Sequence, residues 1–441
     1  MSELRAGFAR RDITQPIGSP ATLGLRVTIT EIWDPLSATA CVVEAAGERV
    51  AIVGLDLCGL LAESHRVIRE RVAQATGGAI PADRVILNVS HSHSAPYLSD
   101  ELQEILRPLG LRLHDDAYAA ALPDLVAAAV MEAADRAVPV SAAMGRGRVE
   151  RVAANRRPRR ADGTVVHRYG RPPQELRDLP EGLIDPDVAV VRFSDARGNG
   201  AGALMVYACH PTASSVGTPP YVSADFPGHA RTALEGEYGH PFVFLQGCAG
   251  NQGTGKWVSG TAWDDTVAMG ARLAAGVAAG LAAAQPVTDA GLRFGVSSLP
   301  LDLDPFPPVA QMERQLEEAA REDNFAPIVA VGDALVVARR LEERRLARIS
   351  AVTFGPDLAL AVLPAETFLE HGLAVRAGSP FRDTIVAAYN DNTLQYVPTR
   401  EAFPDGEYEV NGGWRYIRAG EGERMSAEAV RLLKSLGAGT R

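Results

Sequence analysis

The feature that most constrains the fold is the alternation of two kinds of segment along the chain. Short apolar runs rich in Val, Ile and Leu, typical of buried strands, are separated by longer segments with helical spacing of apolar residues. The predicted strands are 38–44, 49–57, 84–90, 187–194, 202–208, 242–246, 349–354, 358–363 and 384–389. The predicted helices are 63–76, 117–137, 226–237, 264–284, 309–322, 333–347 and 426–436. This alternation predicts an α/β fold with mixed β-sheets flanked by helices.

The chain has 441 residues, of which 46% are apolar, so it can bury a large core. We expect a single large domain over 1–441, with an internal boundary near 303–308, where Asp and Pro residues predict a turn or linker. The stretch 151–186 is rich in Arg, Pro and Gly and has little periodicity. At that length it is either a functional loop or disordered.

The formal net charge of −10 argues against a nucleic-acid partner, because phosphate binding needs a basic face. The N-terminus has no apolar run of signal-peptide length. The four cysteines form no CxxC pair, which favours free thiols in a reducing compartment. We therefore expect a cytoplasmic protein that acts on a small molecule without stable membrane association, and the sequence leaves a homo-oligomer open.

The sharpest local motif is Ser90-His91-Ser92-His93-Ser94, directly after a predicted strand. In an extended segment, residues i and i+2 point to the same side, so both imidazoles can face one site. His91 could bind a metal while His93 acts beside it as an outer ligand or proton shuttle. The alternative is a solvated turn rich in Ser and His.

Two further strand ends carry candidate ligands, His210 and Glu366. A carboxylate after an apolar strand is costly unless it is paired or metal-bound. The alternatives are a histidine satisfied within the core and a carboxylate at a helix start. Two histidines and a carboxylate are a common catalytic zinc set that leaves a position for water. The three candidates follow predicted strands, where sheet proteins of this class place ligands.

The segment 244–251 is a predicted strand that leads into a Gly-rich turn. Backbone N–H groups around Gly247 could form an oxyanion pocket there. Lys256 lies outside the spacing of a P-loop, so a nucleotide-binding loop is not indicated. Asp225 is interpreted as the cap of a predicted helix.

A set of short motifs follows one order between about residues 5 and 410. They are Arg11-Asp12-Ile13-Thr14, Asp34-Pro35-Leu36, Val53-Gly54-Leu55-Asp56, His91-Ser92-His93-Ser94-Ala95-Pro96, Asn155-Arg156, His210-Pro211-Thr212, Ser223-Ala224-Asp225, Phe244-Leu245-Gln246-Gly247, Glu366-Thr367 and Tyr396-Val397-Pro398-Thr399. This ordered set resembles the neutral/alkaline non-lysosomal ceramidase family in its N-terminal catalytic domain. The resemblance implies that domain's fold.

The resemblance also implies a site. His91, His210, Glu366 and Tyr396 would bind one zinc ion, with His93 as an active-site residue beside it. Asn155-Arg156 resembles the family segment that places an arginine in the pocket. Tyr408 resembles the family tyrosine twelve positions beyond the tyrosine ligand.

The chain departs from the family pattern in several places. Leu245-Gln246-Gly247-Cys248 contains no serine where the family's proposed nucleophile lies, and Asn251 stands where the turn typically has Asp. Neither a signal peptide nor the family's C-terminal immunoglobulin-like domain is expected. Cys248 is not assigned as a nucleophile.

These features together predict a zinc-dependent amidohydrolase that cleaves an amide C–N bond of a small polar acyl substrate by metal-activated water. His93 and Tyr408 would handle protons and the oxyanion, and Arg156, Asn155 and Gly247 would bind the substrate. The alternatives are a zinc-dependent lactonase or esterase, a phosphate-ester hydrolase, and a non-catalytic binding protein with a degenerate site.

Overall fold

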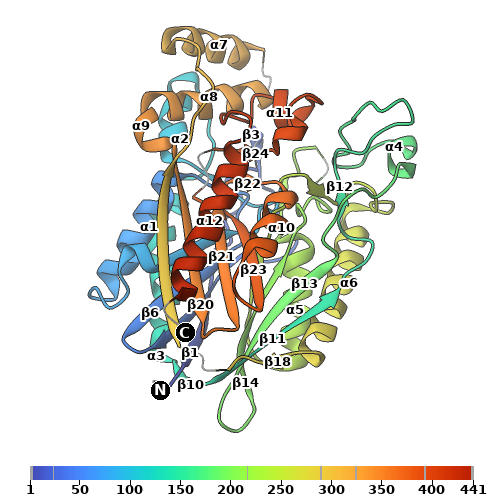
Figure 1. Ribbon diagram of the computed structural model, residues 1–441. Coiled ribbons are helices and arrows are strands. Elements are labelled where there is room, and N and C mark those ends of the chain that lie inside the picture. The colour runs from blue at the N-terminus through green and yellow to red at the C-terminus, as the bar shows by residue number, and fades with distance from the viewer. Residues whose placement is uncertain are drawn as a thin grey trace.

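The computed structural model of the protein describes residues 3–22, 24–215, 217–288, 291–322, 325–391 and 394–438. Three β-sheets form the framework, and helices lie on their outer sides (Figure 1), which confirms the predicted α/β class with mixed sheets. In spatial order the first sheet contains β10 (Val138–Pro139), β1 (Arg5–Asp12), β5 (Ser37–Ala45), β6 (Glu48–Leu55) and β8 (Val85–Val89). The second contains β16 (Phe242–Gln246), β14 (Gly200–Tyr207), β13 (Asp187–Ser194), β11 (Ser141–Arg148) and β18 (Gln285–Pro286). The third contains β19 (Leu292–Pro300), β20 (Leu346–Phe354), β21 (Leu358–Pro364) and β23 (Asp383–Asn390).

The three sheets share one plan. In each, four strands join in chain order through two antiparallel pairings and then one parallel pairing. A parallel pair needs a crossover connection, usually a helix. The crossovers here contain α1 (Ala62–Ala75), α5 (Asp225–Tyr238) and α10 (Leu369–Gly378). The chain therefore repeats one supersecondary unit three times, although its sequence shows no clear repeat.

The inner faces of the three sheets pack against one another. Strand β16 of the second sheet contacts β5, β6 and β8 of the first and β23 of the third. The shared core contains three phenylalanines, one from each sheet: the ring centroid of Phe193 lies 5.7 Å from that of Phe8 and 6.0 Å from that of Phe354. A common apolar core thus fixes the positions of the three sheets relative to one another.

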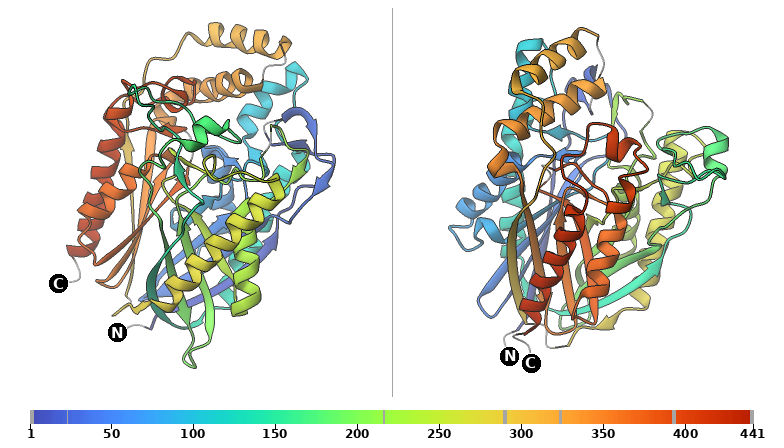
Figure 2. Two further views of the ribbon diagram at one scale, coloured as in Figure 1. Left: turned by 90° about the vertical axis from the view of Figure 1, so that its right-hand side faces the viewer. Right: turned by 45° about the horizontal axis from the view of Figure 1, so that its top comes forward.

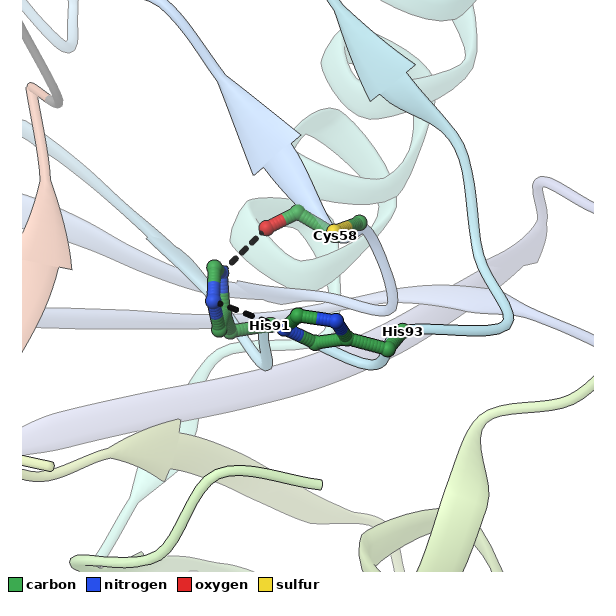
Figure 3. A group of neighbouring side chains, drawn as sticks. All are labelled: Cys58, His91 and His93. Carbon is green, nitrogen blue, oxygen red and sulfur yellow. Dashed lines mark hydrogen bonds between the residues drawn. The ribbon is translucent and has the colours of Figure 1, made fainter. Parts of the chain in front are cut away.

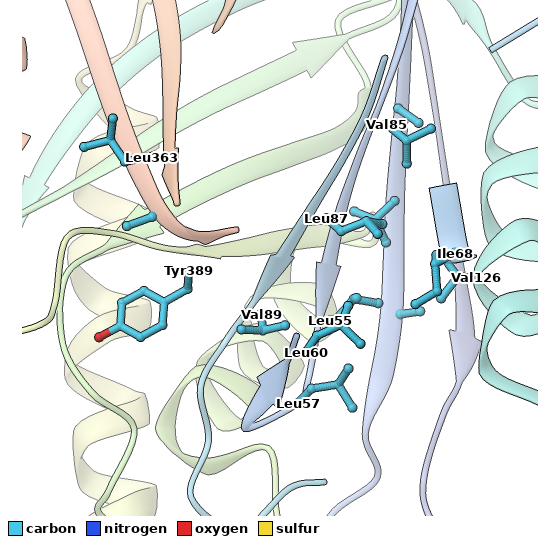
Figure 4. Packing of buried hydrophobic residues seen from close by; sticks show 14 of the residues in the cluster. Leu55, Leu57, Leu60, Ile68, Val85, Leu87, Val89, Val126, Leu363 and Tyr389 are labelled. Carbon is cyan, nitrogen blue, oxygen red and sulfur yellow. The ribbon is translucent and has the colours of Figure 1, made fainter. Parts of the chain in front are cut away.

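The outer faces are covered by pairs of helices (Figures 1 and 2). α1 and α3 (Asp116–Asp135) cover the first sheet, α5 and α6 (Ala262–Ala282) the second, and α10 and α12 (Glu421–Gly437) the third. In β8, Val85, Leu87 and Val89 pack toward Ile68 of α1 and Val126 of α3 (Figure 4). Sheets that are buried on both faces read as nearly continuous apolar runs, which explains the strand pattern in the sequence.

Helix α3 is also the one helix in the described ranges with the length and hydropathy of a membrane span. Its apolar side, which includes Leu122, Val126 and Val130, packs on β1 and β5. That packing agrees with the buried helix expected for this segment.

The remaining short elements connect or cap this framework. The short strands pair as β2 (Pro20–Ala21) with β3 (Gly24–Thr28), β4 (Glu31–Ile32) with β15 (Tyr221–Val222), β7 (Gly59–Leu60) with β9 (Tyr97–Leu98), β12 (Ala154–Asn155) with β17 (Gln252–Gly253), and β22 (Glu366–Thr367) with β24 (Tyr396–Val397). The other helices are α2 (Asp100–Leu106), α4 (Gln174–Asp178), α7 (Val309–Arg321), α8 (Phe325–Arg339), α9 (Leu341–Arg344) and α11 (Tyr408–Asn411).

The structure confirms the predicted strands, and among the strands that the pattern did not indicate the three longest are β1, β11 and β19. β1 and β11 carry several Arg or Gly residues, and β19 is only partly buried, so their apolar signal is weak. The predicted helix 333–347 was wrong in its bounds. α8 ends at Arg339, and Leu346 already pairs with Pro300 in the third sheet, so strand pairing overrides the helical pattern there.

The stretch 151–186 is an ordered loop that contains β12 and α4. The buried Arg168 guanidinium holds it together by donating hydrogen bonds to backbone oxygens on both sides, at Asn155, Leu176, Leu179, Pro180 and Glu181. The segment 303–308 leads from β19 into the hairpin of α7 and α8, seen at the top of Figure 1. The domain boundary expected there stays a prediction.

Candidate metal centre

Loops that follow one strand in each sheet bring three polar side chains to one place. His91 follows β8 in the first sheet, His210 follows β14 in the second, and Glu366 follows β21 in the third. His91 has φ 66°, and Ala365 beside Glu366 has φ 65°. Such left-handed conformations are uncommon for residues other than glycine and often occur at functional sites. They turn the chain sharply where each strand ends.

The ligand atoms of these three residues lie within 4.8 Å of one another. Glu366 Oε2 is 3.0 Å from His210 Nε2 and 3.5 Å from His91 Nε2. All three residues are buried, with exposed fractions of 5% or less. The structure therefore gathers two imidazoles and a carboxylate around one point, from positions far apart in the sequence.

The other ring nitrogen of each histidine is held by backbone carbonyl groups. His91 Nδ1 lies 2.5 Å from Cys58 O, and His210 Nδ1 lies 2.7 Å from Ala249 O and 3.0 Å from Gln252 O. A carbonyl oxygen can only accept, so each Nδ1 carries the proton and donates it. A neutral imidazole then has a bare Nε2. This is how outer partners commonly orient metal-ligating histidines.

Charge at the centre follows from burial and from neighbours. Burial lowers the pKa of both His91 and His210 to about 4, which leaves them neutral at pH 7. Burial opposes ionisation of Glu366, but the two imidazoles and the guanidinium of Arg156 lower the pKa of Glu366 to about 2. Two bare nitrogens and an ionised carboxylate thus face one another with acceptors alone. This donor set fits a divalent cation such as the one that the family resemblance implies.

Tyr396 lies beside this cluster. It pairs with Glu366 in the short β22–β24 ladder, and its ring stacks on that of His210 with centroids 6.4 Å apart. Its hydroxyl oxygen accepts a hydrogen bond of 3.0 Å from Arg156 Nη2. Tyr396 is thus placed as a neighbour of the three ligand atoms, and its role as a fourth ligand stays a prediction.

Arg156 is one of the largest fully buried side chains. It forms an ion pair with Glu409 of α11, where Nε donates to Oε1 at 3.0 Å. Its guanidinium carbon also lies 5.2 Å from the ring centroid of Tyr396 and 5.9 Å from that of Tyr408. Within the described ranges, Nη1 of Arg156 has no hydrogen-bond partner. A buried donor without a partner is costly, so the two N–H bonds of Nη1 are the donors of Arg156 that its other contacts leave over.

A cavity of about 770 Å³ opens onto the centre. Its lining includes the predicted site residues His91, His93, Glu366, Tyr396 and Tyr408. Among the lining residues that the structure describes, none is Leu, Ile, Val, Met or Phe. Most are aromatic, hydroxylic, amide or cationic. A cavity of this volume is large enough for a small organic molecule.

Two lining residues, His167 and Tyr169, were missed by sequence reasoning. Both come from the 151–186 loop, and their rings stack with centroids 5.6 Å apart at an interplanar angle of 9°. His167 also stacks on Tyr408 at 4.8 Å. The only sequence signal was the unusual length of the loop, because nothing in a polar, aperiodic stretch marks which side chains face a site.

His93 is placed between the centre and the cavity. Its Nε2 lies 3.1 Å from His91 Nε2, and the contact is drawn in Figure 3 together with that of His91 to the Cys58 carbonyl. Cys58, His91 and His93 form a second group whose ligand atoms also lie within 4.8 Å of one another. Burial and the Glu366 charge raise the pKa of the Cys58 thiol. A protonated thiol is a poor metal ligand, so the group with His210 and Glu366 is the better candidate.

None of the three predicted substrate-binding residues is part of the cavity lining: Arg156 lies buried behind it, and Asn155 and Gly247 have other partners. The Asn155 side chain holds the loop, donating to Leu183 O and accepting from the Arg157 backbone N–H, and it lines a separate cavity. The N–H of Gly247 donates to Tyr207 O at 2.9 Å, so it is not free to bind an oxyanion. Both residues therefore make structural contacts next to the site, and their roles in substrate binding stay predictions.

The Gly-rich turn has a structural role as well. The Asn251 side chain donates to Glu370 Oε2 at 2.8 Å and accepts from the Leu369 N–H at 3.0 Å, at the start of α10. An aspartate there would place a second carboxylate against Glu370. Cys248 lines a small separate cavity against Gly372. Asn251 is thus explained by its contacts, and Cys248 is placed away from the candidate metal ligands.

Comparison with known proteins agrees with this architecture. A neutral ceramidase from Pseudomonas aeruginosa has a similar crystal structure, with a TM-score of 0.77 and 22% sequence identity over 99% of this chain and 75% of that chain. A structure described as a ceramidase complexed with C2 matches with a TM-score of 0.74 and 21% identity over the same shares. The family described as neutral/alkaline non-lysosomal ceramidase, N-terminal, matches residues 5–259, more than half of the sequence. The chain therefore belongs to the neutral/alkaline non-lysosomal ceramidase family, a family of hydrolases.

Proposed function

We propose that the protein is a zinc-dependent amidohydrolase that cleaves the C–N bond of a small polar acyl substrate. The observation that carries the proposal is the acceptor-only cluster of His91, His210 and Glu366 at a cavity of about 770 Å³. Two imidazoles and a carboxylate are a common catalytic zinc set. Tyr396 would complete the ligands.

The chemistry that zinc supplies when bound is a lower pKa of water and polarisation of a carbonyl group. The residues around the metal would bind the substrate and stabilise the developing charge. The free Nη1–H of Arg156 would hold a carboxylate or carbonyl oxygen of the substrate. His93 Nε2 faces the centre and would bind the oxygen that becomes negative in the transition state. Tyr408 and the His167 ring would form a flat wall against which the substrate packs.

The proposal of a polar substrate rests on the polar groups that stand among the aromatic rings of the lining. A long alkyl chain gains its binding free energy by burying apolar surface against apolar side chains. The described lining has no large aliphatic residue but includes Arg171, Gln395 and Thr218. We therefore infer a compact substrate that carries hydroxyl, carboxylate or amide groups.

Direct attack by water is the version of the reaction that fits this chain. The sequence Leu245-Gln246-Gly247-Cys248 offers no serine, and Cys248 lies away from the candidate ligands, in a separate cavity. A covalent acyl intermediate would need an activated nucleophile beside the centre, and the Cys58 thiol in the cavity lining has a raised pKa that keeps it protonated. Water can attack amides, lactones and other esters at such a centre, so the bond must be identified by measurement.

The test has a metal arm and a substrate arm. Elemental analysis of the purified protein should find about one zinc per chain, and His91→Ala/His210→Ala should lose it. As a control, His240→Ala changes a buried histidine that stacks on Phe242 outside the cavity lining, and it should keep the metal. A matched panel of small amides, lactones, carboxylic esters and phosphate esters should show amide turnover that a chelator abolishes and zinc restores. Equal metal content in the double variant would refute the zinc centre, and turnover confined to esters would refute the amide assignment.

A further inference from the structure

Tyr169, which belongs to the 151–186 loop, reaches over the cavity to His93. Its hydroxyl oxygen lies 2.8 Å from His93 Nδ1. His93 Nε2 in turn lies 3.1 Å from His91 Nε2, and His91 Nδ1 lies 2.5 Å from the carbonyl oxygen of Cys58. Three side chains are therefore linked in one line that ends on a backbone group.

The Cys58 carbonyl, at the end of this line, determines which atom donates in each of the hydrogen bonds. The Cys58 carbonyl can only accept, so His91 donates through Nδ1–H and its Nε2 is bare. A bare Nε2 accepts, so His93 donates to it through Nε2–H. His93 Nδ1 is then bare and accepts from the Tyr169 hydroxyl. His93 Nδ1 is the one hydrogen-bond partner of that hydroxyl within the described ranges, which agrees with its acting as donor.

The Tyr169 ring is held in place from several sides. It stacks on His167 at an interplanar angle of 9°, and the guanidinium carbon of Arg156 lies 5.7 Å from its ring centroid. Arg168, next in sequence, anchors the loop through five backbone oxygens. The hydroxyl therefore meets His93 at a defined position, as a group that orients a catalytic side chain must.

We propose that Tyr169 is a positioning residue that sets the tautomer of His93, so that its Nε2–H points at the metal centre as a hydrogen-bond donor. When His91 Nε2 binds a metal, it no longer accepts from His93. The Tyr169 hydroxyl is then the remaining contact of His93 Nδ1, and because a phenol O–H donates more strongly than it accepts, it favours a bare Nδ1. His93 in this form stabilises negative charge on a substrate oxygen and does not begin the reaction as a base.

The direct test is NMR spectroscopy of protein with ¹⁵N-labelled histidine at neutral pH, before and after addition of Zn²⁺. A His93→Asn variant assigns the His93 resonances. In the unaltered protein, His93 should be in the Nε2–H form in both states. In Tyr169→Phe, which keeps the stacked ring, the zinc-loaded protein should show both tautomers. Tyr118→Phe, which removes a hydroxyl bonded to Ile13 O far from the loop, should leave the His93 signals unchanged.

A second measurement uses turnover, and this arm alone rests on the proposed function. With whichever amide the panel identifies, Tyr169→Phe should lower kcat by about tenfold to a hundredfold, the usual effect of losing an outer partner, with little change in KM or zinc content. A His93 Nδ1–H form in the unaltered protein, or an unchanged tautomer in zinc-loaded Tyr169→Phe, would overturn the inference. Absence of turnover with the expected tautomers would count against the proposed function and leave the role of Tyr169 standing.

Discussion

At the scale of single residues, the hydrogen bonds of a buried polar side chain explain its position in the core. Asn88 lies at the end of β8 directly below His91 and is fully buried. Its Oδ1 accepts from the Gln246 N–H of β16 at 2.7 Å, and its Nδ2 donates to Gln246 O and to Ala388 O of β23. One amide thus connects all three sheets beneath the candidate metal centre.

Removal of this amide should be costly. Asn88→Ala would leave one backbone N–H and two carbonyl groups buried without partners, and each such loss costs about 1–3 kcal/mol. We expect the free energy of unfolding, measured in urea, to fall by about 3–5 kcal/mol. Asn199→Ala, in an exposed turn, is the matched control and should change it by less than about 1 kcal/mol. A loss at Asn88 as small as that of the control would contradict the connecting role.

At the scale of elements, the site depends on a loop with almost no regular structure. The 151–186 loop supplies Arg156, His167 and Tyr169 to the cavity and its surroundings. Its backbone is held by side-chain cations, because the buried Arg168 donates to five carbonyl groups and Lys256 Nζ donates to Arg177 O and Leu179 O. Such bonds replace the ladder hydrogen bonds that helices and strands would have.

Arg168→Met keeps an unbranched side chain but removes the charge and the donors. Hydrogen bonds from a charged group contribute about 1.5–3 kcal/mol, so amide hydrogen exchange in residues 170–185 should become about tenfold faster or more. Hydrogen–deuterium exchange with mass spectrometry measures this directly. Arg160→Met, at an exposed position in the same loop, should leave the exchange rates unchanged. Equal rates in both variants would show that other contacts order the loop.

At the scale of the whole molecule, three copies of one supersecondary plan meet around a shared core, and their loops supply one candidate ligand each. A buried ion pair connects the unit built on the first sheet to the unit built on the third sheet. Arg69 of α1 binds Asp391, next to the end of β23, through two contacts of 2.5 and 2.6 Å. The two residues lie 322 positions apart in the sequence.

This pair predicts an acid-sensitive contribution to stability. Burial opposes ionisation of Asp391, but Arg69 and its other neighbours lower the pKa of Asp391 to about 2. Because this pKa lies below the ordinary value of 3.8, the unfolded chain takes up the proton more readily, and stability falls as the pH drops from about 4 to about 2. Asp391→Asn should flatten that fall in urea unfolding measured at several pH values.

Above that pH range the same variant should lose about 3–5 kcal/mol, because Arg69 stays buried without its carboxylate. Asp383→Asn, at a half-exposed position at the start of the same strand, should lose less than about 1 kcal/mol. If the free energy of unfolding fell equally steeply at low pH with and without Asp391, this ion pair would not be the source of the acid sensitivity.

The sequence by itself determined the layers of this protein and the identity of its candidate ligands. Apolar runs such as 49–57 and 358–363 predict strands buried on both faces because burial leaves no room for polar residues there, and strand ends marked His91, His210 and Glu366. Only the tertiary structure decided which of these side chains meet, because their separation depends on how three sheets pack through a shared core. The same packing brought His167 and Tyr169 to the cavity, which the sequence did not indicate, since a loop held by side-chain cations carries no periodic signal in its sequence.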